Sequence, residues 1–80
     1  MSREEIYAKL PSVFCDVFDI PSVDVSDRTT AEDIEEWDSL SHIQLVVAVE
    51  KAFGIKFTSR EIMRWSNVGE MVDSIISKLA

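Results

Sequence analysis

The tripeptide Asp38-Ser39-Leu40 is the part of this 80-residue sequence best suited to chemistry. Ser39 stands at the first position of a helix that we expect to run to Phe53, and Asp38 is a good N-cap for that helix. Unpaired backbone amides and the positive end of the helix dipole meet at such a position. A phosphate ester on the Ser39 hydroxyl would therefore occupy a favourable anion site. The alternative is that Asp38 and Ser39 only cap the helix, because this pair is common at helix starts and the chain has ten serines.

Other residue types offer little for catalysis or metal binding. His42 is the only histidine and Cys15 the only cysteine, which is too few ligands for a zinc site. The two glycines, Gly54 and Gly69, do not form a phosphate-binding loop, and the acidic stretch 24–27 lacks the ligand alternation of a calcium loop. We therefore predict no catalytic residue, no metal site and no enzymatic activity. We interpret His42 as a surface or capping residue and Cys15 as a packing residue.

Size, composition and charge narrow the function further. The chain is long enough for one small domain, 1–80, and too short for a separate catalytic domain. Its formal net charge of −7 argues against nucleic-acid binding and favours partners with basic docking surfaces. The sequence contains no apolar stretch of about 18 residues and no signal-peptide pattern. We therefore expect no membrane span, a cytoplasmic location in which Cys15 stays unpaired, and a monomer.

Four helices follow from the apolar spacing, which makes the predicted fold class all-α. We expect a small four-helix bundle with three main helices, one short helix and a long first loop. The first helix should run from Ser2 to Phe18 behind a capping-box pattern. Pro11 interrupts it, so that either the helix kinks near Lys9 or the real helix begins at Pro11. The loop 19–37 should be held on the core by four apolar residues: Ile20, Val23, Val25 and Ile34.

The second, third and fourth helices complete the predicted bundle. The second should end at Phe53 before Gly54, and we assign it one apolar face: Leu40, Ile43, Val46, Val47, Val49 and Phe53. A short helix follows Thr58, which again opens a capping-box pattern. The last helix should begin near Ser66 or Asn67, and its apolar residues have the clearest helical spacing in the chain: Val68, Met71, Val72, Ile75, Ile76 and Leu79.

The stretches 37–43 and 50–55 resemble the acyl and peptidyl carrier protein family, and the resemblance extends over essentially the whole chain. In that family a phosphopantetheinyl transferase uses coenzyme A to attach a 4′-phosphopantetheine arm to a serine. The resemblance implies that Ser39 is this serine and that Asp38 caps the helix and helps the transferase to recognise it. It also implies that the terminal thiol of the arm holds a substrate as a thioester, and that acyl-loading and acyl-transfer enzymes are further partners.

Partner enzymes in this family dock on the exposed side of the helix that follows the serine. The resemblance assigns that side here to Leu40 and a nearly uncharged stripe, Ser41, Gln44, Ala48 and Lys51, with Leu40, Ile43 and Val47 supplying apolar contacts beside the stripe. Fatty-acid carriers are often strongly acidic there. Many carriers also have a glycine shortly before the Asp-Ser pair, where this chain has Glu35-Glu36-Trp37.

Four further residues are candidates for contact with the arm or with partners, each with a structural alternative. Trp37 either contacts the arm or packs the loop on the core. Trp65 either lines a groove beside the second helix or packs in the core. Arg60 and Arg64 either form a basic contact patch or pair with the nearby Glu61 on a solvated face.

The weakly charged helix face favours a carrier of acyl or aminoacyl groups in a specialised lipid, polyketide or nonribosomal peptide pathway. The alternative within the family is the general acyl carrier of fatty-acid synthesis. A different class of protein remains open from the residues alone, namely a helical interaction module in which Ser39 is only a cap.

Overall fold

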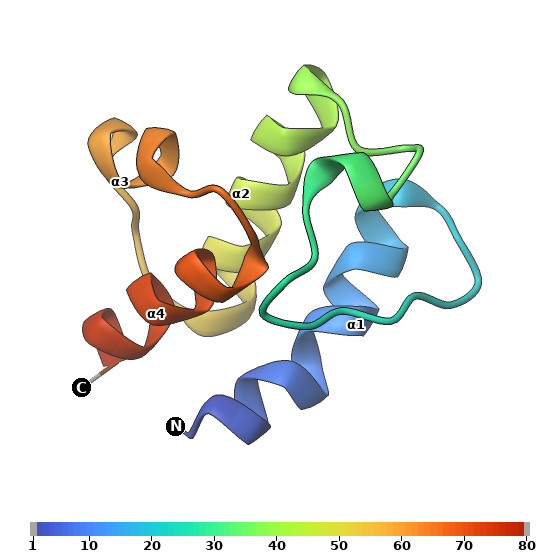
Figure 1. Cartoon of the computed structure of the whole chain (residues 1–80). Coiled ribbons are helices and arrows are strands. Elements are labelled where there is room, and N and C mark those ends of the chain that lie inside the picture. Colours follow the sequence, from blue (N-terminus) through green and yellow to red (C-terminus); the bar gives the residue numbers. More distant parts are fainter. Residues whose placement is uncertain (1, 80) are drawn as a thin grey trace.

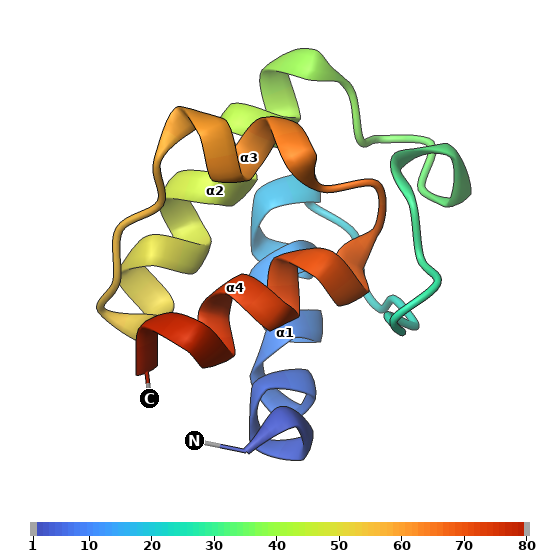
Figure 2. The same cartoon turned by 60° about the vertical axis from the view of Figure 1, so that its left-hand side comes forward.

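The computed structural model describes residues 2–79, and within them the chain forms four α-helices and no strand. The helices are α1 (Arg3–Phe18), α2 (Ser39–Phe53), α3 (Ser59–Arg64) and α4 (Val68–Leu79), and a short 3₁₀ turn (Ala31–Asp33) lies between α1 and α2. Figure 1 shows α1 and α2 running in opposite directions, and Figure 2 shows α3 and α4 beside them. The predicted all-α fold, with three main helices, one short helix and a long first loop, is confirmed.

Helix α1 begins where the capping-box pattern predicts. The Ser2 hydroxyl accepts the amide of Glu5 at 3.2 Å, and the Glu5 carboxylate accepts the amide of Ser2 at 3.0 Å. The helix then continues through Pro11 to Phe18, so the alternative that it begins at Pro11 is wrong. Beside the proline, Ser12 also donates its hydroxyl to the carbonyl of Lys9 at 3.0 Å.

The core lies between α1, α2 and α4. Each of these helices contributes four apolar side chains that are almost completely buried: Ile6, Leu10, Phe14 and Phe18 from α1, Leu45, Val46, Val49 and Phe53 from α2, and Val68, Met71, Val72 and Ile75 from α4. No helix among the described residues is both long enough and apolar enough to cross a membrane.

The predicted core face of α2 is partly wrong. Leu40, Ile43 and Val47 are 68%, 63% and 43% exposed, whereas Leu45, which the spacing argument left out, is completely buried. The helix carries apolar residues around most of its circumference, and the core cluster that it shares with α1 and α4 includes Leu45, Val49 and Phe53. A continuous apolar run does not specify which of its sides will be covered.

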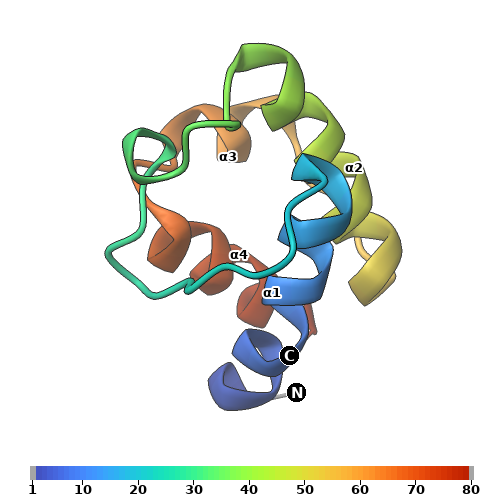
Figure 3. The ribbon, with the colours of Figure 1, turned by 90° about the vertical axis from the view of Figure 1, so that its right-hand side faces the viewer.

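The long connection between α1 and α2 is pinned to the core, as predicted. Ile34 is buried, and Ile20, Val23 and Val25 are half-buried against the same cluster. Figure 3 shows the connection passing from the end of α1 across to the start of α4 before it returns to α2. There the amides of Val68 and Gly69 donate to the carbonyls of Thr29 and Asp27, at 2.8 and 3.0 Å. The connection therefore provides partners for the first free amides of α4.

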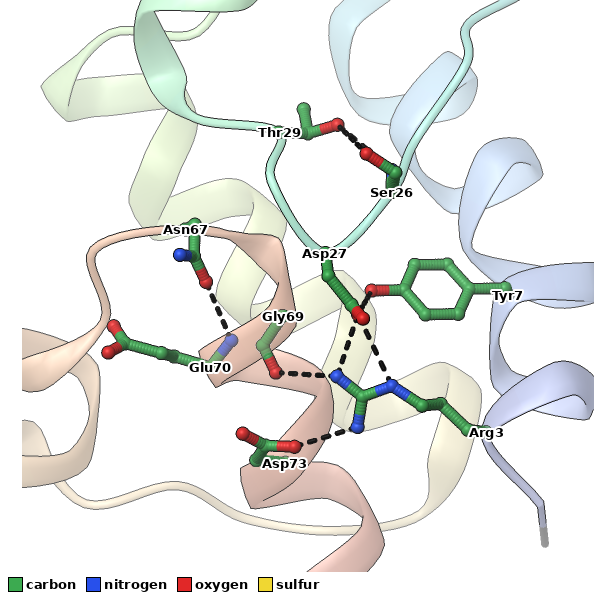
Figure 4. Close-up of polar contacts among 9 residues, drawn as sticks. All are labelled: Arg3, Tyr7, Ser26, Asp27, Thr29, Asn67, Gly69, Glu70 and Asp73. Atoms are coloured by element: carbon green, nitrogen blue, oxygen red, sulfur yellow. Dashed lines mark hydrogen bonds and ion pairs between the residues drawn. The ribbon is translucent and has the colours of Figure 1, made fainter.

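A polar cluster at Asp27 joins three parts of the chain (Figure 4). The Asp27 carboxylate accepts the guanidinium of Arg3 at 2.7 Å and the hydroxyl of Tyr7, both from α1. Arg3 also pairs with Asp73 of α4 at 2.7 Å. The hydrogen bonds from Tyr7 and Arg3 hold the pKa of Asp27 below its ordinary value. This cluster fastens the connection to both terminal helices.

Candidate functional site

The site is built at the first turn of α2, where Asp38 caps the helix as predicted. Asp38 has an extended backbone, and its Oδ1 accepts the amide of Ser41 at 2.8 Å. This backbone hydrogen bond is the main reason that the pKa of Asp38 is lowered, so the carboxylate is charged near neutral pH. Ser41 in turn donates its hydroxyl to the carbonyl of Glu36 at 3.0 Å. Two hydrogen bonds, to Asp38 and to Glu36, therefore tie Ser41 in the first turn of α2 to the segment before the helix.

Ser39 is the first residue of α2, and its side chain is exposed. Residues 39, 42, 46, 49 and 53 are spaced three and four apart, so they share one side of the helix. His42 is half-buried, and Val46, Val49 and Phe53 are buried. Ser39 thus begins a row that runs from solvent into the core. A group attached to its hydroxyl would be open to other proteins, while the helix beneath it is firmly anchored.

Trp37 fixes the backbone immediately before the site. Its ring packs edge-on against Phe14, with centroids 5.5 Å apart, and lies 5.9 Å from the ring of Phe18. Its indole N–H donates to Nδ1 of His42 at 3.1 Å. The alternative in which Trp37 packs the loop on the core is therefore confirmed, and its contact with an attached arm stays a prediction. His42 is not simply a surface residue, because it accepts this bond from a half-buried position.

A small cavity of about 90 Å³ lies beside this pair. Trp37 and His42 form one part of its wall, and Thr30 and Ala31 of the connection form another. Trp65 lines it from the segment before α4, so the groove predicted at Trp65 exists. Trp65 also packs edge-on against Phe57 at 4.8 Å and donates its indole N–H to Ser74 at 3.0 Å. Trp65 therefore both lines this cavity and packs on the core, and its contact with an arm or a partner stays a prediction.

The outward side of α2 differs from the predicted stripe. Gln44 and Lys51 are exposed as expected, but Ser41 and Ala48 are half-buried at its margin. Its most exposed apolar residues are Leu40 and Ile43, both predicted on the apolar face of the helix, of which Leu40 was also predicted on the docking side. The surface beside Ser39 is therefore more apolar than the sequence suggested, and equally poor in negative charge.

Helix α3 presents Arg60 and Arg64 to solvent together with Met63, which is 85% exposed. Among the described residues neither arginine is paired with Glu61, although both lie on the solvated face that this alternative also named. Glu61 instead pairs with Lys78 of α4 at 2.9 Å and accepts the amide of Thr58 at 3.0 Å as part of the helix cap. The geometry is therefore consistent with the alternative in which Arg60 and Arg64 form an exposed basic patch.

Comparison with known proteins decides the family. A family model described as "Phosphopantetheine attachment site" matches residues 8–75 of this chain. The chain belongs to this phosphopantetheine-binding family. The predicted cofactor, 4′-phosphopantetheine, and the resemblance to carrier proteins are thereby confirmed. An exposed serine at a capped helix start fits a group attached through a phosphate, because the free amides and the helix dipole favour the negative charge.

Curated relatives of this phosphopantetheine-binding chain carry the name "Acyl carrier protein". The protein from Acidothermus cellulolyticus is 36% identical over 94% of this chain and 89% of its own length. The protein from Thermotoga maritima is 32% identical over 98% of this chain and 96% of its own length. A solution structure of holo acyl carrier protein from Geobacter metallireducens has a TM-score of 0.85 and is 39% identical, covering 92% of this chain and 85% of that one.

Proposed function

We propose that this protein carries acyl groups as thioesters on a 4′-phosphopantetheine arm attached to Ser39, and that it catalyses no reaction itself. The observation that carries the proposal is the position of Ser39 within the matched region 8–75: an exposed hydroxyl on the first residue of α2. Relatives that bear the name of acyl carrier proteins cover nearly the full chain, which supports acyl groups as the cargo.

The residues around Ser39 have distinct parts in this proposal. Asp38 accepts the amide of Ser41, and the positive end of the α2 dipole would favour the negative charge of a phosphate on Ser39. The packed ring of Trp37 and the buried residues of α2 hold Ser39, to which the arm is attached, in a fixed position. The terminal thiol of the arm, rather than Cys15, holds the cargo. A phosphopantetheinyl transferase attaches the arm, and chemistry on the cargo then belongs to the acyl-loading and acyl-transfer enzymes that the arm visits. The carrier acts as a monomer in the cytoplasm.

We further propose a specialised pathway rather than general fatty-acid synthesis. The outward side of α2 carries Leu40, Ile43 and Gln44 with the positive Lys51 at its end, and its first turn contains no acidic residue. Eight acidic residues and one basic residue lie instead between positions 19 and 38. A partner that docks along the outward side of α2 therefore meets an apolar, weakly charged surface, which offers little attraction to an enzyme with a basic patch.

Intact-mass spectrometry tests the attachment. Incubation with coenzyme A and a broad-specificity phosphopantetheinyl transferase should add one arm to the protein, and Ser39→Ala should gain none. Ser59→Ala is the matched control, because it removes an exposed serine from the first position of another helix, α3, and leaves Ser39 in place. No added mass on the wild type, or an arm on the Ser39→Ala variant, would contradict the proposal.

Asp38 can be tested separately as a cap and as a recognition residue. Asp38→Asn keeps a side-chain oxygen for the Ser41 amide but removes the charge, whereas Asp38→Ala removes both. Loss of stability in a urea titration should be clear for Ala and small for Asn. If the transferase reads the charge, both variants should be modified more slowly than the wild type under conditions where all three stay folded. Equal rates for Asn and wild type would leave Asp38 as a cap only.

A further inference from the structure

Trp37 and His42 form a hydrogen-bonded pair on either side of the attachment serine. The two rings are nearly parallel, with an angle of 22° and centroids 6.0 Å apart, and the indole N–H donates to Nδ1 of His42 at 3.1 Å. An indole N–H can only donate, so Nδ1 must offer a lone pair. The imidazole in this arrangement is therefore neutral, with its proton on Nε2.

This pair connects the segment before Ser39 to the first turn of α2. Only Asp38 separates Trp37 from Ser39, and His42 lies one turn further along the helix. Trp37 is also held from the other side, because its amide donates to the carbonyl of Ile34 at 3.1 Å and its ring packs on Phe14. The bond to His42 is thus the link by which α2 fixes the orientation of this indole.

The surroundings of His42 offer its charged form no partner among the described residues. Across the cavity it faces Thr30, Ala31, Trp65, Asn67 and Met71, none of which is charged. The residues of α1 behind Trp37 are the rings of Phe14 and Phe18. The carboxylate of Asp38, on the same helix, accepts the amide of Ser41. Burial accordingly lowers the pKa of His42 from its ordinary value of 6.5.

We propose that His42 is a positioning residue for Ser39: its neutral imidazole holds Trp37, and with it the segment that presents the serine, and its protonation releases that segment. When Nδ1 gains a proton, both ring nitrogens become donors and the bond from the indole is lost. The part of this inference that concerns modification of Ser39 rests on the proposed function. The coupling between His42 and Trp37 does not.

Nuclear magnetic resonance on the wild-type protein tests the coupling directly. The indole N–H resonance of Trp37, assigned through its loss in Trp37→Phe, should shift with pH and share its midpoint with the ring protons of His42. That midpoint should lie below 6.5. The indole of Trp65, which donates to Ser74, provides an internal control and should not follow this titration. A Trp37 indole resonance that does not shift as His42 becomes protonated would overturn the proposal.

The effect on the serine is measured with His42→Asn, whose Oδ1 can accept the indole bond but does not titrate. Both proteins are incubated with the same transferase and coenzyme A over a range of pH in which their spectra remain those of folded chains. The enzyme's own pH dependence cancels in the ratio of the two rates. The ratio of wild type to His42→Asn should fall about fivefold as His42 becomes protonated, the factor that corresponds to one ordinary hydrogen bond.

A ratio that stays constant with pH would overturn the positioning role, even where the two resonances titrate together. If neither protein gains an arm at any pH, the proposed function fails, and the resonance measurement still decides whether His42 controls Trp37.

Discussion

The carbonyl oxygen of Asp27 lies 2.8 Å from the point at which a Cβ atom on Gly69 would stand. The Gly69 amide donates to that same carbonyl at 3.0 Å, so the first turn of α4 and the long connection meet backbone to backbone. Only glycine permits this approach. The contact holds the connection against α4 within a few residues of the cavity beside His42.

Gly69→Ala should therefore destabilise the protein although it places a better helix former in α4. The new methyl group meets backbone rather than a movable side chain, and overpacking of this kind costs about 1–3 kcal/mol. Chemical denaturation of wild type and variant measures the difference. Ser77→Ala, at an exposed position of the same helix, is the control and should be neutral or slightly stabilising. A Gly69→Ala protein as stable as the control would mean that the connection is not docked as described.

Two substitutions to alanine on α2 should separate its buried side from its exposed side. Leu45→Ala removes a completely buried side chain and should cost about 2–5 kcal/mol. Ile43→Ala removes one that is 63% exposed, and the free energy of unfolding should change by no more than about 0.5 kcal/mol. Urea titrations of both variants provide the comparison. Equal losses of unfolding free energy would mean that Ile43 contributes to the core, as the sequence predicted.

The contrast between these two residues shows how far sequence could lead. The starts of the helices were predictable because caps are local. Each capping side chain bonds to a residue within four positions in the sequence: Ser2 to Glu5, Asp38 to Ser41, and Thr58 to Glu61. The buried side of α2 could not be predicted, because its apolar residues surround most of the helix and the packing partners decide which of them are buried.

Contacts between residues far apart in the sequence could not be predicted from the sequence either. Asp27 lies 24 residues from Arg3, and Arg3 lies 70 residues from Asp73. Nothing in the residue types distinguished Asp27 from the other acidic residues of the loop, or Asp73 from the other acidic residues of the helices. The candidate site was recognisable because Asp38 and Ser39 are adjacent. The bond from Trp37 to His42 joins a loop residue to a helix residue and follows no regular spacing.

The cluster at Asp27 predicts how stability changes with pH. Because the folded state holds the pKa of Asp27 below 3.8, its contribution is fully present above that pH and is lost as the pH falls through the folded value. Tyr7→Phe removes the largest cause of this shift. The urea midpoint of the variant should lie below that of the wild type at pH 7, and the gap should narrow toward pH 3. In an Asp27→Asn background the same substitution should have a smaller effect. A difference in urea midpoint that is constant with pH would show that Tyr7 does not act through the carboxylate of Asp27.

Added negative charge on α2 should improve exchange with fatty-acid enzymes. We expect the wild type, bearing the arm with its thiol free, to be a poor acceptor for a fatty-acid malonyl transferase, and Gln44→Glu with Lys51→Glu to be a better one. Ser41 is left unchanged because its hydroxyl bonds to Glu36. The gain should shrink as salt rises, since exposed charges are screened over about 8 Å at physiological ionic strength.

The pair Ala8→Glu with Arg28→Glu is the matched control for this exchange assay, because it changes the net charge equally at exposed positions outside α2. An equal gain in the control would assign the effect to net charge. Efficient exchange by the wild type would replace the specialised pathway with general fatty-acid synthesis.

The ion pair between Arg3 and Asp73 brings the start of α1 beside α4, and the first turn of α2 lies at the opposite end of the molecule (Figures 1 and 2). Purification tags, fluorophores or surface linkers joined before α1 or after α4 would therefore stand away from Ser39. The protein could be immobilised or fused at that end while its serine remains open to large enzymes. The same geometry suits the chain to insertion into a host protein, because a host would meet both ends of the inserted segment on one side.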